Sequence, residues 1–252
     1  MTDSALIILY DFTSKGGKPA PWNPNTWKAR YSLNYKGLAF ETIWLEYPDV
    51  EPTLKAAGVP PTGTRDDRPL YTLPAIVDPS TGAAVAESLL IAKYLDKTYQ
   101  DKPLILPQST QTLQVAFLDI LPTHPHPILQ FTLQKITQNI LSPESEFYCR
   151  MVWAAMPNVL PPGVHLDDVF PVESRAKGWE KLEKHFAEIA ERWIGNETFI
   201  TGATASFADF ALAGLLQCFK KAWGEDSEEW ERVICFQGGR WKKLLEDLQQ
   251  YE

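Results

Sequence analysis

Cysteine is scarce in this 252-residue chain. The three cysteines, Cys149, Cys218 and Cys235, include no closely spaced pair. Disulfide frameworks and structural zinc sites both need paired or clustered cysteines, so the sequence predicts neither of them. We expect no site for another metal either. Cys218 lies in an apolar helical segment, and we expect it to be a small core residue.

Clusters of basic residues and long apolar runs are missing as well. The chain has 24 Lys and Arg against 32 Asp and Glu, a formal net charge of −8. This balance argues against nucleic acid and against anionic membrane surfaces as partners. No apolar run reaches the ~18 residues of a membrane helix, and residues 1–4 lack the features of a secretory signal. We therefore expect a cytoplasmic protein that binds neither nucleic acid nor membranes.

What is present is an ordinary globular composition, with 44% hydrophobic and 22% charged residues. In the first hundred residues, strand and helix patterns alternate. The first strand, helix and strand form a unit whose two strands should be parallel. A long proline-bearing connection, residues 47–71, then precedes a hairpin and a helix. The predicted order is strand 6–10, helix 22–37, strand 40–45, short helix 52–57, strands 75–77 and 83–85, and a helix ending near residue 99.

Helix patterns dominate the rest of the chain. The clearest is residues 174–194, where apolar side chains step by three and four along one face and Gly195 ends the pattern. Ser206 and Asp209 have the spacing of a capping box ahead of another apolar segment. Further candidates are 110–121, 128–141 and 144–156. The predicted domains are an α/β domain at 1–100, a linker at 101–108 and an all-α domain at 109–252.

Residues 71–95 contain the most informative motif. Pro74 opens a strand, a position that proline tolerates because it donates no ladder hydrogen bond. A cis bond there would leave the backbone N–H and C=O of Leu73 facing outward, where an extended peptide can pair with them. Ser88 precedes an apolar helical segment, and its hydroxyl can accept from the free amides of the first turn. Taken alone, the motif is equally compatible with a hairpin followed by a capped helix.

Together with the capping box, this motif resembles the glutathione transferases, whose all-helical domain opens its central helix with such a box. The resemblance is strongest to the fungal FuA (etherase-related) class, on residues 22–28, 33–38 and 44–49. It implies a thioredoxin-like N-terminal domain, an all-helical C-terminal domain and a homodimer. Leu73 and Pro74 would hold the cysteinyl backbone of glutathione. Glu87 would pair with its ammonium group, while Ser88 and the helix amides would take its carboxylate.

Asn23 departs from this family pattern. Relatives place a Ser or Cys at this position, before a proline at the start of the first helix, to stabilise the glutathione thiolate. Asn23 also has a complete structural explanation, because Asn is among the best N-caps and Pro24 suits the first helical position. Its amide NH₂ would still be free to donate to the sulfur, but Asn is no nucleophile. Thr26 and Ser14 are nearby hydroxyls that could substitute for the missing Ser.

Simple energies limit how strongly Asn23 and the helix could stabilise the glutathione thiolate. Lowering a thiol pKa by two units requires about 2.7 kcal/mol of preferential thiolate stabilisation. A helix dipole contributes ~0.3–1 kcal/mol and a neutral amide donor about 1 kcal/mol. Since the sum of these two contributions is less than about 2.7 kcal/mol, we expect weaker thiol activation than in the relatives with Ser.

A second substrate would lie between the two domains. Trp22 is a candidate wall, and residues 116–130 and 151–153, with Met151, are candidates for the opposite side. His124 lies among prolines without a metal-ligand spacing, so pocket lining is favoured over metal binding. Aromatic pockets of this kind suit flat apolar ligands such as polyphenols.

Two functions of different class remain open. One is a detoxifying enzyme that conjugates glutathione to electrophiles, reduces peroxides or cleaves aryl ethers with it. The other is a non-catalytic ligandin that binds and sequesters aromatic compounds. Asn23 favours the ligandin more than a Ser would, whereas the motif at residues 71–95 favours glutathione binding in either case.

Overall fold

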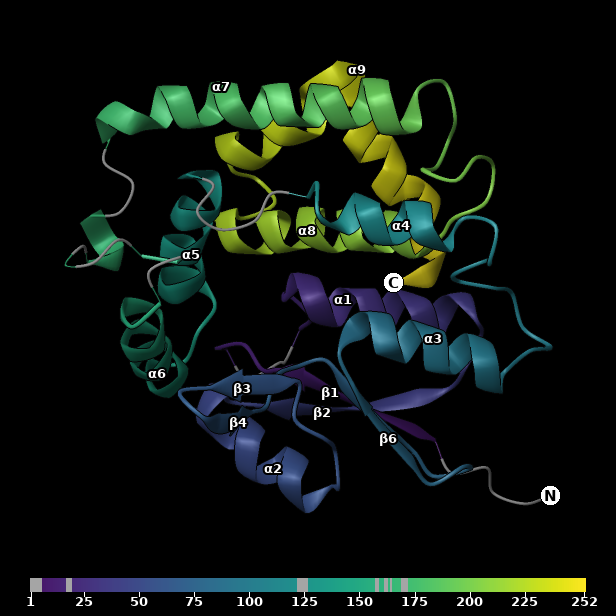
Figure 1. Ribbon diagram of the computed structural model, residues 1–252. Coiled ribbons are helices and arrows are strands. Elements are labelled where there is room, and N and C mark those ends of the chain that lie inside the picture. Colours follow the sequence, from purple (N-terminus) through teal and green to yellow (C-terminus); the bar gives the residue numbers. More distant parts are fainter. Residues whose placement is uncertain are drawn as a thin grey trace.

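A mixed β-sheet and a bundle of helices form the two halves of the molecule (Figure 1). The computed structural model describes residues 6–16, 20–121, 127–156, 159–160, 163, 165–168 and 172–252. The first half contains β1 (Ile7–Phe12), α1 (Pro24–Tyr35), β2 (Phe40–Leu45), a 3₁₀ turn (Tyr47–Asp49), α2 (Val50–Ala56), β3 (Gly63–Arg65), β4 (Arg68–Leu70), β5 (Ala75–Asp78), β6 (Ala83–Ala86) and α3 (Ser88–Thr98).

The second half is helical throughout its described residues. It contains α4 (Gln111–Leu118), α5 (Pro127–Asn139), α6 (Pro143–Ala154), a 3₁₀ turn (Leu166–Asp168), α7 (Val172–Glu188), a π-helical stretch (Ile189–Ile194), α8 (Phe207–Trp223), α9 (Glu228–Leu248) and a 3₁₀ turn (Gln249–Tyr251). None of the helices in the described part of the chain is long and apolar enough to cross a bilayer.

The main sheet has the strand order β2-β1-β5-β6. β1 and β2 are parallel, as the sequence predicts, with Leu9 opposite Thr42, and the other two pairs are antiparallel. Helices α1 and α3 cover the sheet face that looks toward the helical half, and α2 covers the other face (Figure 1). Because β1 and β2 run parallel, the loops that follow them begin at the same edge of the sheet.

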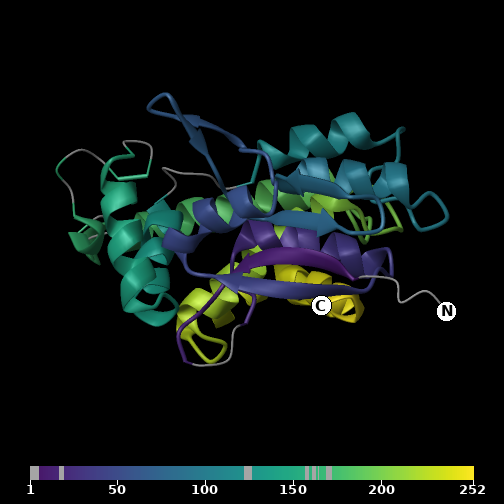
Figure 2. The ribbon, with the colours of Figure 1, turned by 90° about the horizontal axis from the view of Figure 1, so that it is seen from below.

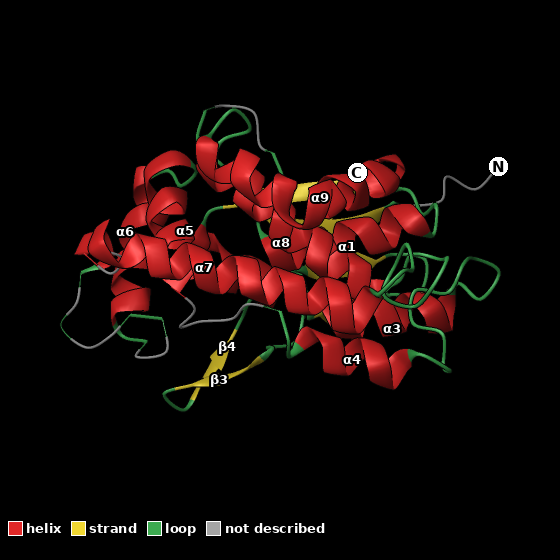
Figure 3. Ribbon diagram, turned by 90° about the horizontal axis from the view of Figure 1, so that it is seen from above, coloured by secondary structure: helices red, strands yellow, loops and turns green. Residues whose placement is uncertain are grey.

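Helix α8 is the centre of the helical half. Almost all of its residues are buried, and it packs directly on α1. Viewed from above, α7 crosses over α8, so that α8 is enclosed between α7 and α1 (Figure 3). The predicted capping box is confirmed at its start, where the Asp209 carboxylate accepts from the backbone N–H of Ser206 at 2.9 Å.

A buried ion pair joins the sheet half to the following segment. Lys36, just after α1, is fully buried and pairs with Asp96 of α3 at 2.9 Å. Its ammonium also donates to the Pro103 carbonyl, while Asp96 accepts from the backbone of Ile105 and Leu106. A buried charge is stable only when it is paired and hydrogen-bonded, so these contacts fix α1, α3 and residues 103–106 together.

The connection after β2 holds more structure than the sequence predicts. Besides a short helix, close to the expected one, it forms the small antiparallel hairpin β3–β4, which projects from the body of the molecule (Figures 2 and 3). The turn residues Asp66 and Asp67 have φ of 49° and 58°. Hairpin turns of this type need two left-handed residues, and Asp tolerates that conformation.

Candidate functional site

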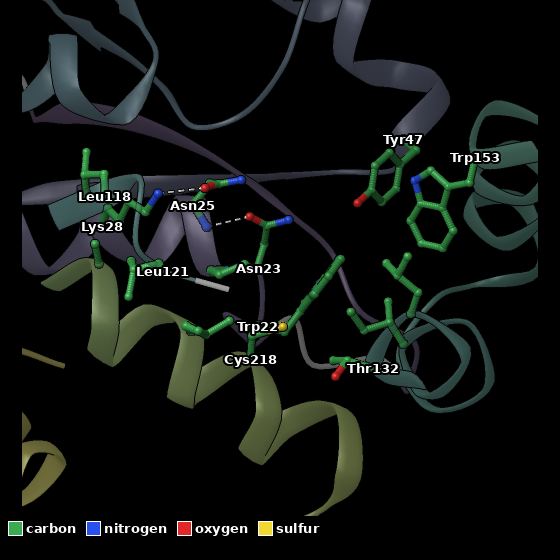
Figure 4. Close-up of a pocket in the computed structure, with 15 residues that line it drawn as sticks. Trp22, Asn23, Asn25, Lys28, Tyr47, Leu118, Leu121, Thr132, Trp153 and Cys218 are labelled. Atoms are coloured by element: carbon green, nitrogen blue, oxygen red, sulfur yellow. Dashed lines mark hydrogen bonds between the residues drawn. The ribbon is translucent and has the colours of Figure 1, made fainter. Parts of the chain in front are cut away.

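The first turn of α1 is shaped by Asn23. Its side-chain oxygen accepts from the backbone N–H of Asn25 at 2.9 Å and of Thr26 at 3.3 Å, and Pro24 occupies the first helical position. The predicted N-cap is therefore confirmed. Since the oxygen is engaged by the helix, the NH₂ of the same amide points away from the helix amides (Figure 4).

A cavity of about 390 Å³ lies at this helix end, between the two halves of the molecule. This volume is within the range of small-molecule sites. Its walls come from the α1 entry, the loop after β2, and helices α4, α5, α6 and α8 (Figure 4). The lining residues are Trp22, Asn23, Pro24, Asn25, Lys28, Tyr47, Leu118, Leu121, Thr132, Leu133, Ile136, Trp153, Ala211, Leu215 and Cys218.

Titratable groups on the cavity wall are perturbed by burial. Burial lowers the pKa of Lys28, although the Glu87 carboxylate opposes this shift, and the Lys28 ammonium donates to the Asn25 side chain at 2.9 Å. Burial raises the pKa of Tyr47 well above its ordinary value and that of the Cys218 thiol to about 12. At neutral pH the phenol of Tyr47 and the thiol of Cys218 are therefore both protonated.

Leu73 and Pro74 precede β5 and are joined by a cis peptide bond. The Pro74 carbonyl accepts from the backbone N–H of Glu87 at 3.2 Å. Within the described part of the chain, the backbone N–H and C=O of Leu73 make no hydrogen bond. These two groups are thus available to an extended peptide, the arrangement that strand addition requires.

Glu87, rather than Ser88, is the N-cap of α3, so the predicted cap position was wrong by one residue. The Glu87 carboxylate accepts from the backbone N–H of Leu89 and of Leu90, both at 3.1 Å, and from the Ser88 hydroxyl at 3.2 Å. Glu87 has a φ of 79°, which turns its long side chain back over the helix start. Ser88 is the first helical residue, and its hydroxyl donates to this carboxylate instead of accepting from the amides.

The remaining predicted site residues are placed in different surroundings. Trp22 is buried on the cavity wall, and its indole N–H donates to the Thr13 carbonyl at 3.0 Å. Thr26 is fully buried and donates to the Asn23 carbonyl at 3.1 Å, and Ser14 accepts from the Ala20 N–H at 3.3 Å. Neither hydroxyl lines the cavity.

Met151 does not contribute to the described site. Met151 is 58% exposed on α6 and is absent from the cavity wall. The reason is helical geometry: Trp153 faces the cavity, and a residue two positions earlier lies about 200° around the helix. His124 lies outside the described residues. No group of three or more described His, Cys, Asp or Glu side chains could hold a metal ion.

Sequence reasoning missed Tyr47 and Lys28 as cavity residues. The signal for Tyr47 was available, because it follows β2 directly and the parallel strands β1 and β2 end at the edge where α1 begins. Lys28 is one turn beyond the cap on the same helix, and its charge gave no indication of which way it points.

A thioredoxin-like domain, a helical domain and a cavity between them at the start of α1 define the glutathione transferase fold, which confirms the predicted fold class. The family model described as the glutathione S-transferase N-terminal domain matches residues 22–98, and the model of the C-terminal domain matches residues 112–251. The chain belongs to the glutathione S-transferase family.

Solved fungal structures agree over nearly the whole chain. The chain is 36% identical to a glutathione S-transferase of Ceriporiopsis subvermispora in complex with glutathione, with a TM-score of 0.90 and 98% of each chain covered. It is 36% identical to glutathione transferase GSTFuA3 from Phanerochaete chrysosporium, with a TM-score of 0.89, covering 99% of this chain and 98% of that one.

The curated relatives match over a shorter stretch. Glutathione S-transferase-like protein ustS of Aspergillus flavus is 38% identical over 109 residues, which is 41% of this chain and 39% of the relative. The chain spans about two fifths of the length of the curated relatives that it matches.

Proposed function

We propose that this protein binds glutathione along the edge at Leu73 and conjugates it, through its sulfur, to electrophiles held in the cavity beside Asn23. The observation that carries the proposal is the open backbone pair of Leu73 together with the anionic cap at Glu87, which Pro74 joins by a backbone hydrogen bond. The glutathione bound to the Ceriporiopsis relative supports the same ligand.

Each part of the tripeptide has a matching group. The Leu73 N–H and C=O pair with the cysteinyl backbone, as an added strand would. The Glu87 carboxylate pairs with the γ-glutamyl ammonium, and the Ser88 hydroxyl is within reach of the adjacent carboxylate. The sulfur is then directed to the start of α1, where the Asn23 NH₂ and the positive end of the helix dipole favour an anion.

The second ligand is expected to be flat and aromatic. The cavity wall combines the aromatic rings of Trp22, Tyr47 and Trp153 with aliphatic side chains from α4, α5 and α8. Aromatic rings stack favourably on such surfaces, which suits polyphenol-like compounds. Besides conjugation, we propose glutathione-dependent cleavage of aryl ethers or reduction of peroxides.

Calorimetric titration with glutathione tests the proposal. Glu87→Gln keeps a capping oxygen but removes the charge that pairs with the ammonium, so we expect about tenfold weaker binding, equivalent to about 1.4 kcal/mol. Glu180→Gln, at an exposed position of α7, is the matched control and should bind as the wild type does. Equal affinity in the wild type and Glu87→Gln would remove Glu87 from the site, and no binding at all would refute the proposed function.

A ligandin is the second candidate, and the observation that favours it is Asn23 itself. An amide activates a thiol less than a hydroxyl or a second thiol does, while the apolar cavity does not depend on that activation. Turnover of an electrophile no faster than that of free glutathione at equal pH, with tight binding of aromatic compounds, would establish this reading. We also propose a homodimer, which light scattering would detect.

A further inference from the structure

Tyr47 lines the same cavity as Asn23, and its hydroxyl points toward the Asn23 amide (Figure 4). The ring is held in place by its neighbours. It stacks on Phe12 at a centroid distance of 4.1 Å and an interplanar angle of 21°, and lies 6.5 Å from the Trp22 ring. Such stacking restricts the ring to one orientation, so the direction of the hydroxyl is built into the wall.

The backbone of this residue is anchored as well. The Tyr47 N–H donates to the Ser145 hydroxyl at 3.0 Å. The preceding Glu46 carboxylate accepts from the Ser142 hydroxyl at 2.6 Å and from the Ser145 hydroxyl. These bonds tie the loop after β2 to the start of α6, and they place the phenol at a fixed position relative to the α1 cap.

The polar groups around this hydroxyl are the Asn23 side chain and the Cys149 thiol, and both affect the Tyr47 pKa. Because the Asn23 oxygen is committed to the helix amides, its NH₂ is the group that is left to face the cavity (Figure 4). The phenol has a hydrogen to donate, and an anion arriving at the cavity would attract it more strongly than a neutral thiol, which is a weak acceptor.

We propose that the Tyr47 hydroxyl donates to the glutathione sulfur, as a second hydrogen bond beside that of the Asn23 amide. This inference rests on the proposed function. Tyr47 thereby supplies the hydroxyl that relatives carry at the position of Asn23, from a different element. It is a catalytic residue in the sense that it contacts the reacting sulfur.

The charge state of the surroundings is compatible with this role. The titratable groups packed against Tyr47 are Cys149 and Tyr148 of α6 and Cys218 of α8, and burial raises the pKa of both thiols to about 12. Lys28 of α1 lines the same cavity. With both cysteines neutral and the phenol itself protonated, the hydroxyl is a donor at neutral pH and no neighbouring thiolate competes for it.

The step is defined with 1-chloro-2,4-dinitrobenzene as the electrophile. The glutathione thiol loses its proton to water, and its sulfur forms a bond to the ring carbon that carries chlorine. Chloride then leaves with the electron pair of the carbon–chlorine bond. The Tyr47 and Asn23 donors act before the attack, by favouring the thiolate over the thiol.

The bound thiol is titrated through the ultraviolet absorbance of its thiolate, in the wild type and in Tyr47→Phe. The variant keeps the stacked ring, and we expect the pKa of bound glutathione to rise by about one unit. Turnover of 1-chloro-2,4-dinitrobenzene should fall about tenfold at neutral pH and recover at high pH, where the thiol ionises without help. Affinity for S-methylglutathione, which has no thiol, should stay the same.

Two further variants separate this role from a structural one. Tyr148→Phe is the matched control. The Tyr148 ring stacks on that of Tyr47 at a centroid distance of 6.2 Å and does not line the cavity, and the variant keeps this ring, so bound glutathione should titrate as in the wild type. Cys149→Ala removes the thiol that lies near the phenol and should not raise the pKa of bound glutathione. If Cys149→Ala reproduces the effect of Tyr47→Phe, or if Tyr47→Phe leaves the bound thiol pKa unchanged, the inference is overturned.

A measurement on the wild-type protein tests the same hydrogen bond even if a variant fails to fold. With tyrosines labelled at the ζ-carbon, the Tyr47 resonance should shift on adding glutathione and shift less with S-methylglutathione. Equal shifts would contradict the hydrogen bond. If the wild type binds neither ligand, the proposed function fails rather than the role of Tyr47.

Discussion

At the scale of single residues, Asn23 and Tyr47 are positioned by contacts of different range. The capping role of Asn23 depends on backbone amides within one helical turn, so Asn23 and Pro24 alone were enough to predict it. Tyr47 could not be assigned in the same way. Its position beside Asn23 depends on the parallel pairing of β1 with β2 and on contacts with α6, which involve residues about 100 positions apart.

Asn23→Ser is predicted to increase catalysis without loss of stability. Ser is as good an N-cap as Asn, so the free energy of unfolding should change by less than about 0.5 kcal/mol. Its hydroxyl can accept from the helix amides while donating to the sulfur, and we expect about three- to tenfold faster conjugation near pH 6.5. Initial rates at saturating glutathione, with thermal melting alongside, provide the measurement.

Asn23→Ala is the comparison for this substitution. It removes the cap and the donor together, so it should lose about 1 kcal/mol of stability and give the slowest turnover of the three. Equal rates for the Ser and Ala variants would show that the residue at this position does not interact with the sulfur.

At the scale of elements, long amphipathic or apolar patterns were informative and short polar ones were not. The strands and helices of the N-terminal domain lie within a few residues of their predicted bounds. The hairpin β3–β4 was missed because its three-residue strands are mostly exposed and show no alternation. Only the pair Asp66-Asp67 indicated its turn, and two Asp residues also suit an ordinary loop.

The cap of α8 leads to a prediction about pH. Burial raises the pKa of Asp209 from its ordinary value of 3.8 to about 6, although hydrogen bonds from Ile200 and Ser206 oppose the shift. Because the folded-state pKa lies above the unfolded value, the stability contributed by this group is complete below about pH 4 and is lost as the pH rises to about 6.

Asp209→Asn removes this titration, so the two proteins should respond differently to pH. We expect the stability of the wild type relative to Asp209→Asn to fall by about 2–3 kcal/mol between about pH 4 and pH 6. Urea unfolding at several pH values across this window measures the difference. Parallel stability curves for the two proteins would mean that Asp209 does not bind an additional proton in the folded state.

At the scale of the whole molecule, the two halves are joined along α1. Gln217 of α8 donates to the Tyr31 hydroxyl at 3.2 Å and to the Glu252 carboxylate at 2.5 Å. Asn34 donates to the Tyr251 carbonyl at 2.9 Å. The helix that carries the Asn23 cap is therefore positioned by the helical half as much as by its own sheet, and the order of elements alone could not predict these contacts.

Gly214 marks the closest approach between the halves. A Cβ added there would lie 2.7 Å from the Pro24 carbonyl oxygen and 3.0 Å from the Trp27 Cβ. Both neighbours belong to the first turns of α1, and one is backbone, so a side chain at this position requires the helix end to move. Glycine is needed here because two backbones approach closely, and not because of its φ angle.

Gly214→Ala is therefore predicted to affect both stability and the site. Overpacking should cost about 1–3 kcal/mol, and the displaced α1 start should raise the pKa of bound glutathione by carrying Asn23 away from the sulfur. Gly63→Ala is the matched control, because its added Cβ would meet nothing within 4 Å. Melting and thiol titration of both variants test the coupling. A Gly214→Ala protein that loses stability but keeps the wild-type thiol pKa would show that the site does not depend on how closely α8 packs on α1.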